Sequence, residues 1–223
     1  MIPQQETRAP HFDSLLAAGG QGHGRRWLDA QRIGARQQFM GARLPSRKDE
    51  TWRYTSLDAL LDTAWTRRHE ESLADVDIQR TLLIDAPAAR LVFVDGRWNP
   101  QLSELRVADG RVQIGSLRSA LDDPSDPVAR WLGTALPSTS AETSAPASFA
   151  ALNTALLEDG AWVHVGAGVH AEGPIELLYL CTAHATEKQD SAPAVLPRNL
   201  IVLEDGAAAT VVEHYVGVQD GTY

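Results

Sequence analysis

Apolar runs broken by glycines lie within residues 151–180, and further apolar runs follow up to residue 217; together they restrict the possible folds more than any other feature of the chain. They begin in "AWVHVG" and continue in "PIELLYLCTA", "NLIVLEDG" and "AAATVVEHYVG". Runs of this length predict strands. Because glycine tolerates positive φ, we expect Gly160, Gly166, Gly168 and Gly173 at corners where consecutive strands change direction. No Lys-Ser or Lys-Thr follows these glycines, which excludes a phosphate-binding P-loop.

The dipeptide Asp-Gly recurs beside the strands, at residues 95, 109, 159 and 205, and "EDGA" occurs at 158 and again at 204. A turn that is repeated before strands predicts stacked rungs, in which each unit buries its apolar side against its neighbours. The pattern does not give the handedness of such a coil. The last strand would present an open backbone edge, and we expect self-association through the terminal strands to cover it.

A helix-period pattern precedes the strand-rich part. Residues 25–41 place five apolar side chains near one face, and Gly41 with Pro45 ends the helix; the five are Trp27, Leu28, Ala35, Phe39 and Met40. We interpret Arg25, Arg32 and Arg36 as a solvated face rather than as a docking surface for an acidic partner. Further along, we expect Trp52 and Tyr54 to cover the edge of a core rather than to stack on a ligand.

Mixed structure is predicted between this helix and the strand-rich part. Asp95-Gly96 follows the apolar run "LVFV" and predicts a hairpin, while Ser116 and Pro127 are typical of the starts of two helices. The small, polar "PSTSAETSAPAS" is typical of a linker. The expected organisation is a mainly helical region with short strands over 1–135, a linker over 136–147, and strand rungs over 148–223 that are incomplete at the C-terminal end.

Composition narrows the class of protein. The chain has 223 residues, a formal net charge of −9 and one cysteine, Cys181, so no internal disulfide can form. Residues 1–55 carry nine basic and five acidic side chains and the remainder carries 11 and 24, which argues against nucleic-acid binding. Neither a signal peptide nor a membrane-spanning run is recognisable, so we expect a cytoplasmic protein without membrane contact.

Residues that could carry chemistry are scattered. Thiolate and imidazole groups bind iron or zinc, but the spacing of the candidates does not match a metal site; they are Cys181, His164, His170, His184 and His214. Asp159, Glu172 and Glu176 lie at or near turns, where we expect solvated carboxylates. We therefore predict no catalytic, cofactor-binding or metal-ligating residue and a protein that is not an enzyme.

Two enzyme classes remain as alternatives. The first is a carbohydrate-active parallel β-helix, a lyase or hydrolase with carboxylates along a groove, although nothing in the sequence marks such a groove. The second is a left-handed hexapeptide acyltransferase, which is the weaker alternative because its strict six-residue repeat is missing.

Three stretches resemble the SufB/SufD family of the SUF iron–sulfur cluster assembly system, and SufD-like members in particular. They are "LPSRKDETWRYTSLDALL", "FAALNTALLEDGAWVHVGAGVHAEGPIELLYL" and "RNLIVLEDGAAATVVEHYVG". The resemblance implies a mixed α and β fold, in which a helical N-terminal region is followed by the first rungs of a right-handed parallel β-helix. It also implies a non-catalytic scaffold that supports the assembly and transfer of a cluster.

The resemblance further implies that this chain corresponds to the N-terminal portion of such proteins. In the family, the remaining part carries helices that dock the SufC-like ATPase and polar residues near the interface with the SufB-like subunit. We therefore expect SufB-like and SufC-like partners for the full-length protein, an iron–sulfur cluster in the full complex, and no cofactor bound by this chain. Cys181 is expected to be a buried, inert thiol on the same strand face as Tyr179.

Overall fold

A computed structural model describes residues 11–17, 25–67, 78–106, 110–123, 127–135, 145–182 and 192–217. The chain forms two compact units that alternate along the sequence. The helical unit comprises Met1–Arg67, Gly133–Leu157 and Ala185–Leu196, and the sheet unit comprises Arg68–Leu132, Glu158–His184 and Pro197–Tyr223. The chain thus passes between the units several times, whereas the sequence analysis places a single boundary within 136–147.

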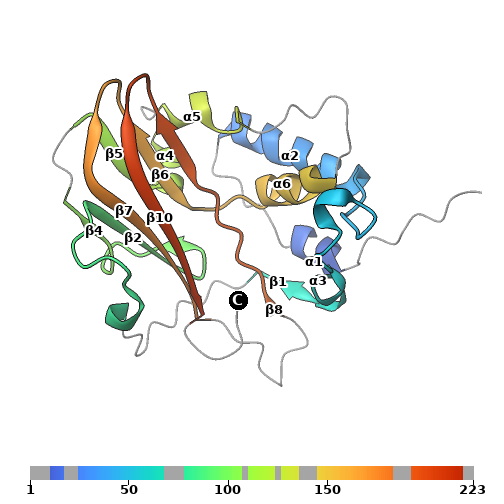
Figure 1. The fold of residues 1–223 in the computed structure, drawn as a ribbon. Coiled ribbons are helices and arrows are strands. Elements are labelled where there is room, and N and C mark those ends of the chain that lie inside the picture. Colours follow the sequence, from blue (N-terminus) through green and yellow to red (C-terminus); the bar gives the residue numbers. More distant parts are fainter. Residues whose placement is uncertain are drawn as a thin grey trace, which may run out of the picture. The chain divides into compact units, whose positions relative to one another are not determined.

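Helices build most of the helical unit (Figure 1). Their bounds are α1 His11–Ala17, α2 Arg26–Gly41, η1 Glu50–Trp52, α3 Asp58–Asp62 and α6 Ala145–Ala155, and strand β1 Trp65–Thr66 pairs in parallel with β8 Ala192–Pro193. The helix predicted over 25–41 is confirmed and ends at Gly41. No helix among the described residues is both long and apolar enough to span a bilayer.

Apolar side chains from three helices form the core of the helical unit. They are Phe12, Leu15 and Leu16 of α1, Ala35 and Phe39 of α2, and Ala151, Leu152 and Ala155 of α6, with Leu156 directly after it. The rings of Phe12 and Phe39 meet edge to face, with centroids 5.7 Å apart. This geometry suits the ring quadrupoles and fixes the face that α2 buries.

Two residues of α2 differ from the sequence interpretation. Arg32 is only 6% exposed and its guanidinium donates a hydrogen bond to the carbonyl of Leu157, so it does not belong to a solvated face. The carbonyls at the end of a helix lack partners within the helix, and a buried arginine supplies one just past the end of α6. Met40 is 47% exposed although its spacing places it near the apolar stripe.

Strands dominate the sheet unit (Figure 1). They are β2 Ala89–Val94, β3 Arg97–Trp98, β4 Glu104–Leu105, β5 Val112–Ser116, β6 Ala161–Val165, β7 His170–Cys181, β9 Leu200–Leu203 and β10 Ala208–Gly217. The short helices of this unit are η2 Ile78–Thr81, α4 Leu117–Asp122 and α5 Val128–Trp131.

Two sheets form in this unit, and parallel pairing joins their longer strands. The first sheet has the order β10-β7-β2-β3 with β4 also paired to β2, and the second has the order β5-β6-β9. The pairs β2/β7, β7/β10 and β6/β9 are parallel, while β2/β3, β2/β4 and β5/β6 are antiparallel. Parallel stacking is thus present in the region predicted for it, and it begins earlier, at β2, within the part expected to be mainly helical.

The strands β6 and β7 are followed, one layer further, by β9 and β10. Trp162 lies opposite Leu200 and His170 opposite Ala208, an offset of 38 residues in both pairs. At the corner between the strands, Gly168 (φ 68°) and Gly206 (φ 71°) both adopt the left-handed conformation. The two "EDGA" motifs are 46 residues apart, so they occupy different corners, and the interpretation of them as equivalent turns is wrong.

The two sheets share an apolar core. From the first sheet it contains Ala89, Leu91, Phe93, Ile175, Leu177 and Tyr179, and from the second Ala161, Val163 and Val165. On the other face of the first sheet, Val92, Val94, Leu178 and Leu180 pack with Ile78, Leu82, Leu102 and Val216. Both faces are therefore buried in β2 and in residues 175–180 of β7, as is usual for strands within a parallel sheet.

Local turns in the sheet unit follow their sequence signals. Asp95 (φ 48°) and Gly96 (φ 83°) connect β2 to β3, which confirms the predicted hairpin. The Asp95 carboxylate accepts hydrogen bonds from the backbone N–H and the hydroxyl of Thr182, at 2.8 and 2.6 Å. Ser116 caps α4 by accepting a hydrogen bond from the N–H of Ser119.

Candidate functional site

The described side chains that could bind a metal are spread over the strands β6, β7 and β10. Cys181 is half-buried at the end of β7, less enclosed than the sequence analysis expects. His164, His170 and His214 belong to β6, β7 and β10, and His184 lies outside the described residues. Within the described ranges, no three His, Cys, Asp or Glu side chains are grouped as a metal ion would require.

His164 contacts the corner of the next layer. Its Nε2 lies 3.0 Å from Oε1 of Glu204, and Oε2 of Glu204 accepts a hydrogen bond from the N–H of Ala167 at 3.1 Å. These two contacts hold the pKa of Glu204 below its usual value, and the contact with His164 has the larger effect. The Glu204 carboxylate therefore connects two corners of the sheet unit.

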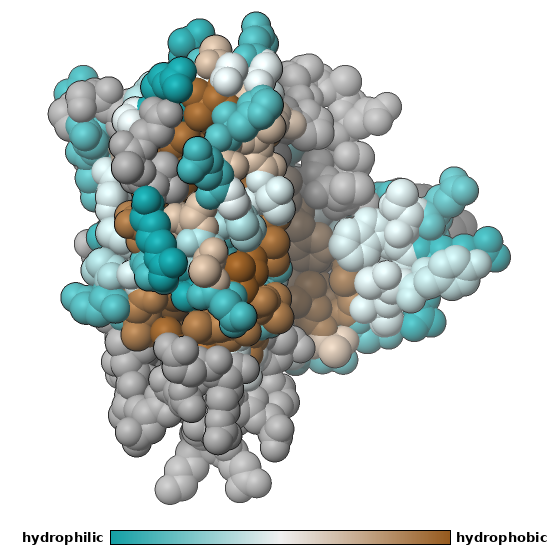
Figure 2. Space-filling model, turned by 60° about the vertical axis from the view of Figure 1, so that its left-hand side comes forward, coloured by the Kyte–Doolittle hydropathy of each residue, from teal (hydrophilic) through white to brown (hydrophobic). Residues whose placement is uncertain are grey.

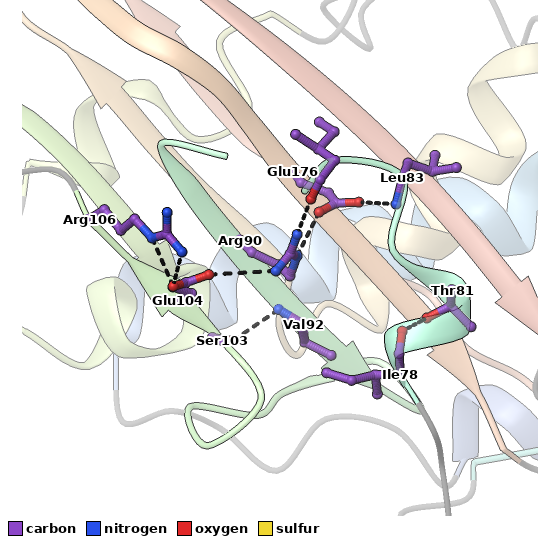
Figure 3. Close-up of polar contacts among 10 residues, drawn as sticks. Ile78, Thr81, Leu83, Arg90, Val92, Ser103, Glu104, Arg106 and Glu176 are labelled. Atoms are coloured by element: carbon purple, nitrogen blue, oxygen red, sulfur yellow. Dashed lines mark hydrogen bonds and ion pairs between the residues drawn. The ribbon is translucent and has the colours of Figure 1, made fainter. Parts of the chain in front are cut away.

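Among the described residues, the most enclosed ion pair lies on the first sheet (Figure 3). Glu176 of β7 is 0% exposed and Arg90 of β2 is 6% exposed, and Arg90 Nε donates to Glu176 Oε2 at 2.6 Å. The two residues are direct partners in the parallel register. The prediction that Glu176 is solvated is therefore wrong. A charged residue within the apolar run "PIELLYL" was the available sign of a buried partner.

The Arg90–Glu176 pair also holds the segment that follows η2 (Figure 3). Oε1 of Glu176 accepts from the N–H of Leu83 at 3.1 Å, and Arg90 Nη2 donates to the carbonyl of Ile84. Arg90 Nη1 lies 3.6 Å from Glu104, which in turn binds Arg106. The charges of the two arginines and the two glutamates thus balance. Through Glu176 and Arg90, the group holds the backbone of Leu83 and Ile84 against the sheet.

Asp159 is a second buried carboxylate, so the prediction that it is solvated is wrong. It is 3% exposed. Oδ1 accepts from the hydroxyl of Ser116 at 2.8 Å and from the N–H of Arg118 at 3.1 Å, and Oδ2 accepts from the N–H of Trp98 at 3.0 Å. A carboxylate engaged by this many donors joins the β3 hairpin to the start of α4.

In the edge strands β9 and β10, some side chains on the core side of the sheets are partly exposed. Ile201 and Leu203 of β9 are partners of the buried Val163 and Val165, yet they are 39% and 47% exposed. Tyr215 of β10 is 44% exposed. Apolar surface lies open between hydrophilic side chains over the sheets in Figure 2. This end of the two sheets, defined by Ile201, Leu203 and Tyr215, is the open end, and it can accept further strands.

Comparison with known proteins finds similar proteins that are all named as SufBD or SufD proteins. The family described as "SufBD protein N-terminal region" matches residues 21–177. The iron-sulfur cluster assembly SufBD family protein slr0076 of Synechocystis is 29% identical over 185 residues, covering 83% of this chain and 38% of the relative. The iron-sulfur cluster assembly protein SufD of Escherichia coli is 29% identical over 188 residues, covering 84% of this chain and 39% of the relative.

The chain therefore spans less than two fifths of the length of these curated relatives. The family match extends from before α2 into β7, so it includes elements of both the helical unit and the sheet unit. Since this match covers more than half of the sequence, the chain belongs to the SufBD family and corresponds to the N-terminal region of its members.

Proposed function

We propose that this chain is part of a non-catalytic scaffold subunit that supports the assembly and transfer of iron–sulfur clusters. The observation that carries the proposal is the family match over residues 21–177. The two relatives, which are named for iron-sulfur cluster assembly, support the same role. The buried carboxylates are consistent with a scaffold, because Asp159 and Glu176 are engaged in structural hydrogen bonds.

For the fold, we propose that the stacked layers are the first rungs of a right-handed parallel β-helix. The parallel pairs β6/β9 and β7/β10 support this proposal; the offset is 38 residues in β6/β9, and in β7/β10 it is 38 at His170 and 36 from Pro174 onward. A coil of this kind is extended by adding strands, so the open end suits either further rungs or a second protein.

We further propose that the full-length protein works in the cytoplasm, in a complex with a SufB-like subunit and a SufC-like ATPase. The cluster would be held in that complex, because the described residues of this chain offer no grouped ligands. When the chain is alone, self-association through β9 and β10 would cover the open end.

Complementation tests the proposed function. A strain that lacks its own SufD would receive the full-length gene, and the activity of an iron–sulfur enzyme would be measured in extracts. We expect restored activity, and we expect the SufB-like and SufC-like subunits to co-purify with the protein. A protein that folds, fails to restore activity and instead cleaves a polysaccharide would support the carbohydrate-enzyme alternative.

A further inference from the structure

The loop between α2 and α3, residues 43–56, has a fixed shape. Asp49 accepts hydrogen bonds from the N–H and hydroxyl of Ser46, at 2.8 and 3.2 Å, and from Nη1 of Arg43 at 2.8 Å. These hydrogen bonds hold the pKa of Asp49 far below its usual value. The bond from Arg43 has the largest effect, and the bond from the backbone N–H of Ser46 has the next largest. The backbone carbonyl of Asp49 accepts from the N–H of Trp52 at 2.9 Å.

The two aromatic rings of this loop point to different surroundings. Trp52 is half-buried, and its ring lies 5.8 Å from that of Phe149 in α6. Tyr54, two residues later, is 91% exposed, and the guanidinium carbon of Arg53 lies 5.6 Å from its ring centroid. The expectation that both rings cover a core edge is therefore wrong for Tyr54. The loop is anchored through Trp52 and presents Tyr54 to the outside.

Basic side chains outnumber acidic ones in the loop that carries the exposed ring. The loop contains Arg43, Arg47, Lys48 and Arg53 against Asp49 and Glu50, and Arg43 already balances Asp49. Arg47, Lys48 and Arg53 are exposed. Tyrosine and arginine are the residue types that most often dominate the binding energy of protein interfaces. An ordered loop also loses little conformational entropy when it binds.

We propose that residues 43–56 dock an acidic face of a partner protein, with Tyr54 as the apolar anchor and Arg47 and Arg53 as the cationic contacts. Charge complementarity selects this partner, because an exposed tyrosine within a basic loop fits a surface that carries Asp and Glu around an apolar patch. A nucleic acid fits less well, since the chain as a whole has a net charge of −9. The inference goes beyond the scaffold role and rests on it only in that a scaffold subunit meets other proteins.

A photocrosslinking experiment tests this docking surface. The photoreactive p-benzoylphenylalanine replaces Tyr54 in the full-length protein, cells are irradiated, and the crosslinked segments are identified by mass spectrometry. We expect segments of another protein that are rich in Asp and Glu. Arg53→Glu should reduce the yield by about fivefold or more, whereas Arg53→Lys should retain most of it. Ile33 of α2, which is 59% exposed, is the matched control position.

Several results would overturn the docking proposal. The first is an equal crosslinking yield at Ile33 and Tyr54. The second is a crosslink from Tyr54 to a basic segment, to nucleic acid or to another copy of the chain. The third is a crosslinking yield that does not change with Arg53→Glu. Because Tyr54 and Arg53 are exposed, thermal melting should confirm that the variants fold. Failed complementation by the wild-type protein would reject the scaffold function instead, so the two proposals fail by different measurements.

Discussion

Tyr215 stacks on Tyr179, with ring centroids 4.7 Å apart and ring planes inclined by 14°. Tyr179 stacks in turn on Phe93 at 4.8 Å, so three neighbouring strands contribute one aromatic ladder. The middle member, Tyr179, is only 1% exposed, and burial raises the pKa of its hydroxyl above the usual value. The ladder stops at Tyr215, which is 44% exposed. It therefore leads to the open end of the sheets.

The open end should cause self-association of the isolated chain. Leu203→Arg places a charge among the exposed core-facing side chains, and like charges would then face each other across a contact between two copies. We expect sedimentation at several concentrations to show association of the wild-type chain and a shift of the variant toward monomer. Leu83→Arg is the control, because Leu83 is 59% exposed in the loop after η2. A wild-type chain that remains monomeric at high concentration would contradict this prediction.

Gly160 should tolerate no side chain. A Cβ atom at this position would lie 1.9 Å from the backbone oxygen of Arg198 in the chain that enters β9. We expect Gly160→Ala to lower the free energy of unfolding by more than about 3 kcal/mol in urea titration. Gly34 in α2 has open space, so Gly34→Ala should stabilise by about 0.5–1 kcal/mol. Equal effects of the two substitutions would disprove the close approach of Gly160 and Arg198.

Removing one member of the buried Arg90–Glu176 pair should lower the free energy of unfolding more than replacing both members with apolar residues. Glu176→Ala leaves Arg90 enclosed without its main carboxylate partner, and we expect a loss of about 3–5 kcal/mol in the free energy of unfolding. The double variant Arg90→Met with Glu176→Leu removes both charges and should recover most of that loss. Urea titration of the two single variants and the double variant measures the coupling. Strictly additive losses would show that the two side chains do not depend on each other.

Glu204 should contribute a pH-dependent part of the stability. Its pKa is lowered in the folded chain, so the contribution is present above the ordinary value of 4.5 and is lost as the pH falls through the lower, folded-state value. We expect thermal stability to decline on acidification with a smaller slope in Glu204→Gln than in the wild type. His164→Ala, which removes the first cause of the shift, should reduce the slope in the same direction. Parallel slopes in all three proteins would exclude this contact as a source of pH dependence.

Cys181 should not be an essential cluster ligand in this chain. We expect anaerobic reconstitution with iron and sulfide to leave the isolated chain without stoichiometric iron, and Cys181→Ser to have the same iron content as the wild type. Iron analysis and the visible absorption spectrum measure both. Stoichiometric iron in the wild type that disappears in Cys181→Ser would make this thiol a ligand.

The sequence by itself determined the local features of this protein. The helix Arg26–Gly41 followed from its apolar period and its terminal glycine, and the hairpin at Asp95-Gly96 followed from its turn residues. The strand-rich C-terminal part followed from apolar runs broken by glycines. Each of these signals acts over a few residues, because backbone conformation and side-chain period are set by near neighbours.

Only the tertiary structure decided which residues are buried and which strands are partners. Arg90 and Glu176 lie 86 residues apart, and their enclosure depends on the parallel register of β2 and β7. Trp52 and Tyr54 have similar sequence surroundings, yet Trp52 packs against the ring of Phe149 while Tyr54 is 91% exposed. Burial and pairing depend on contacts between segments distant in the sequence, and a local pattern carries no information about which distant segment arrives.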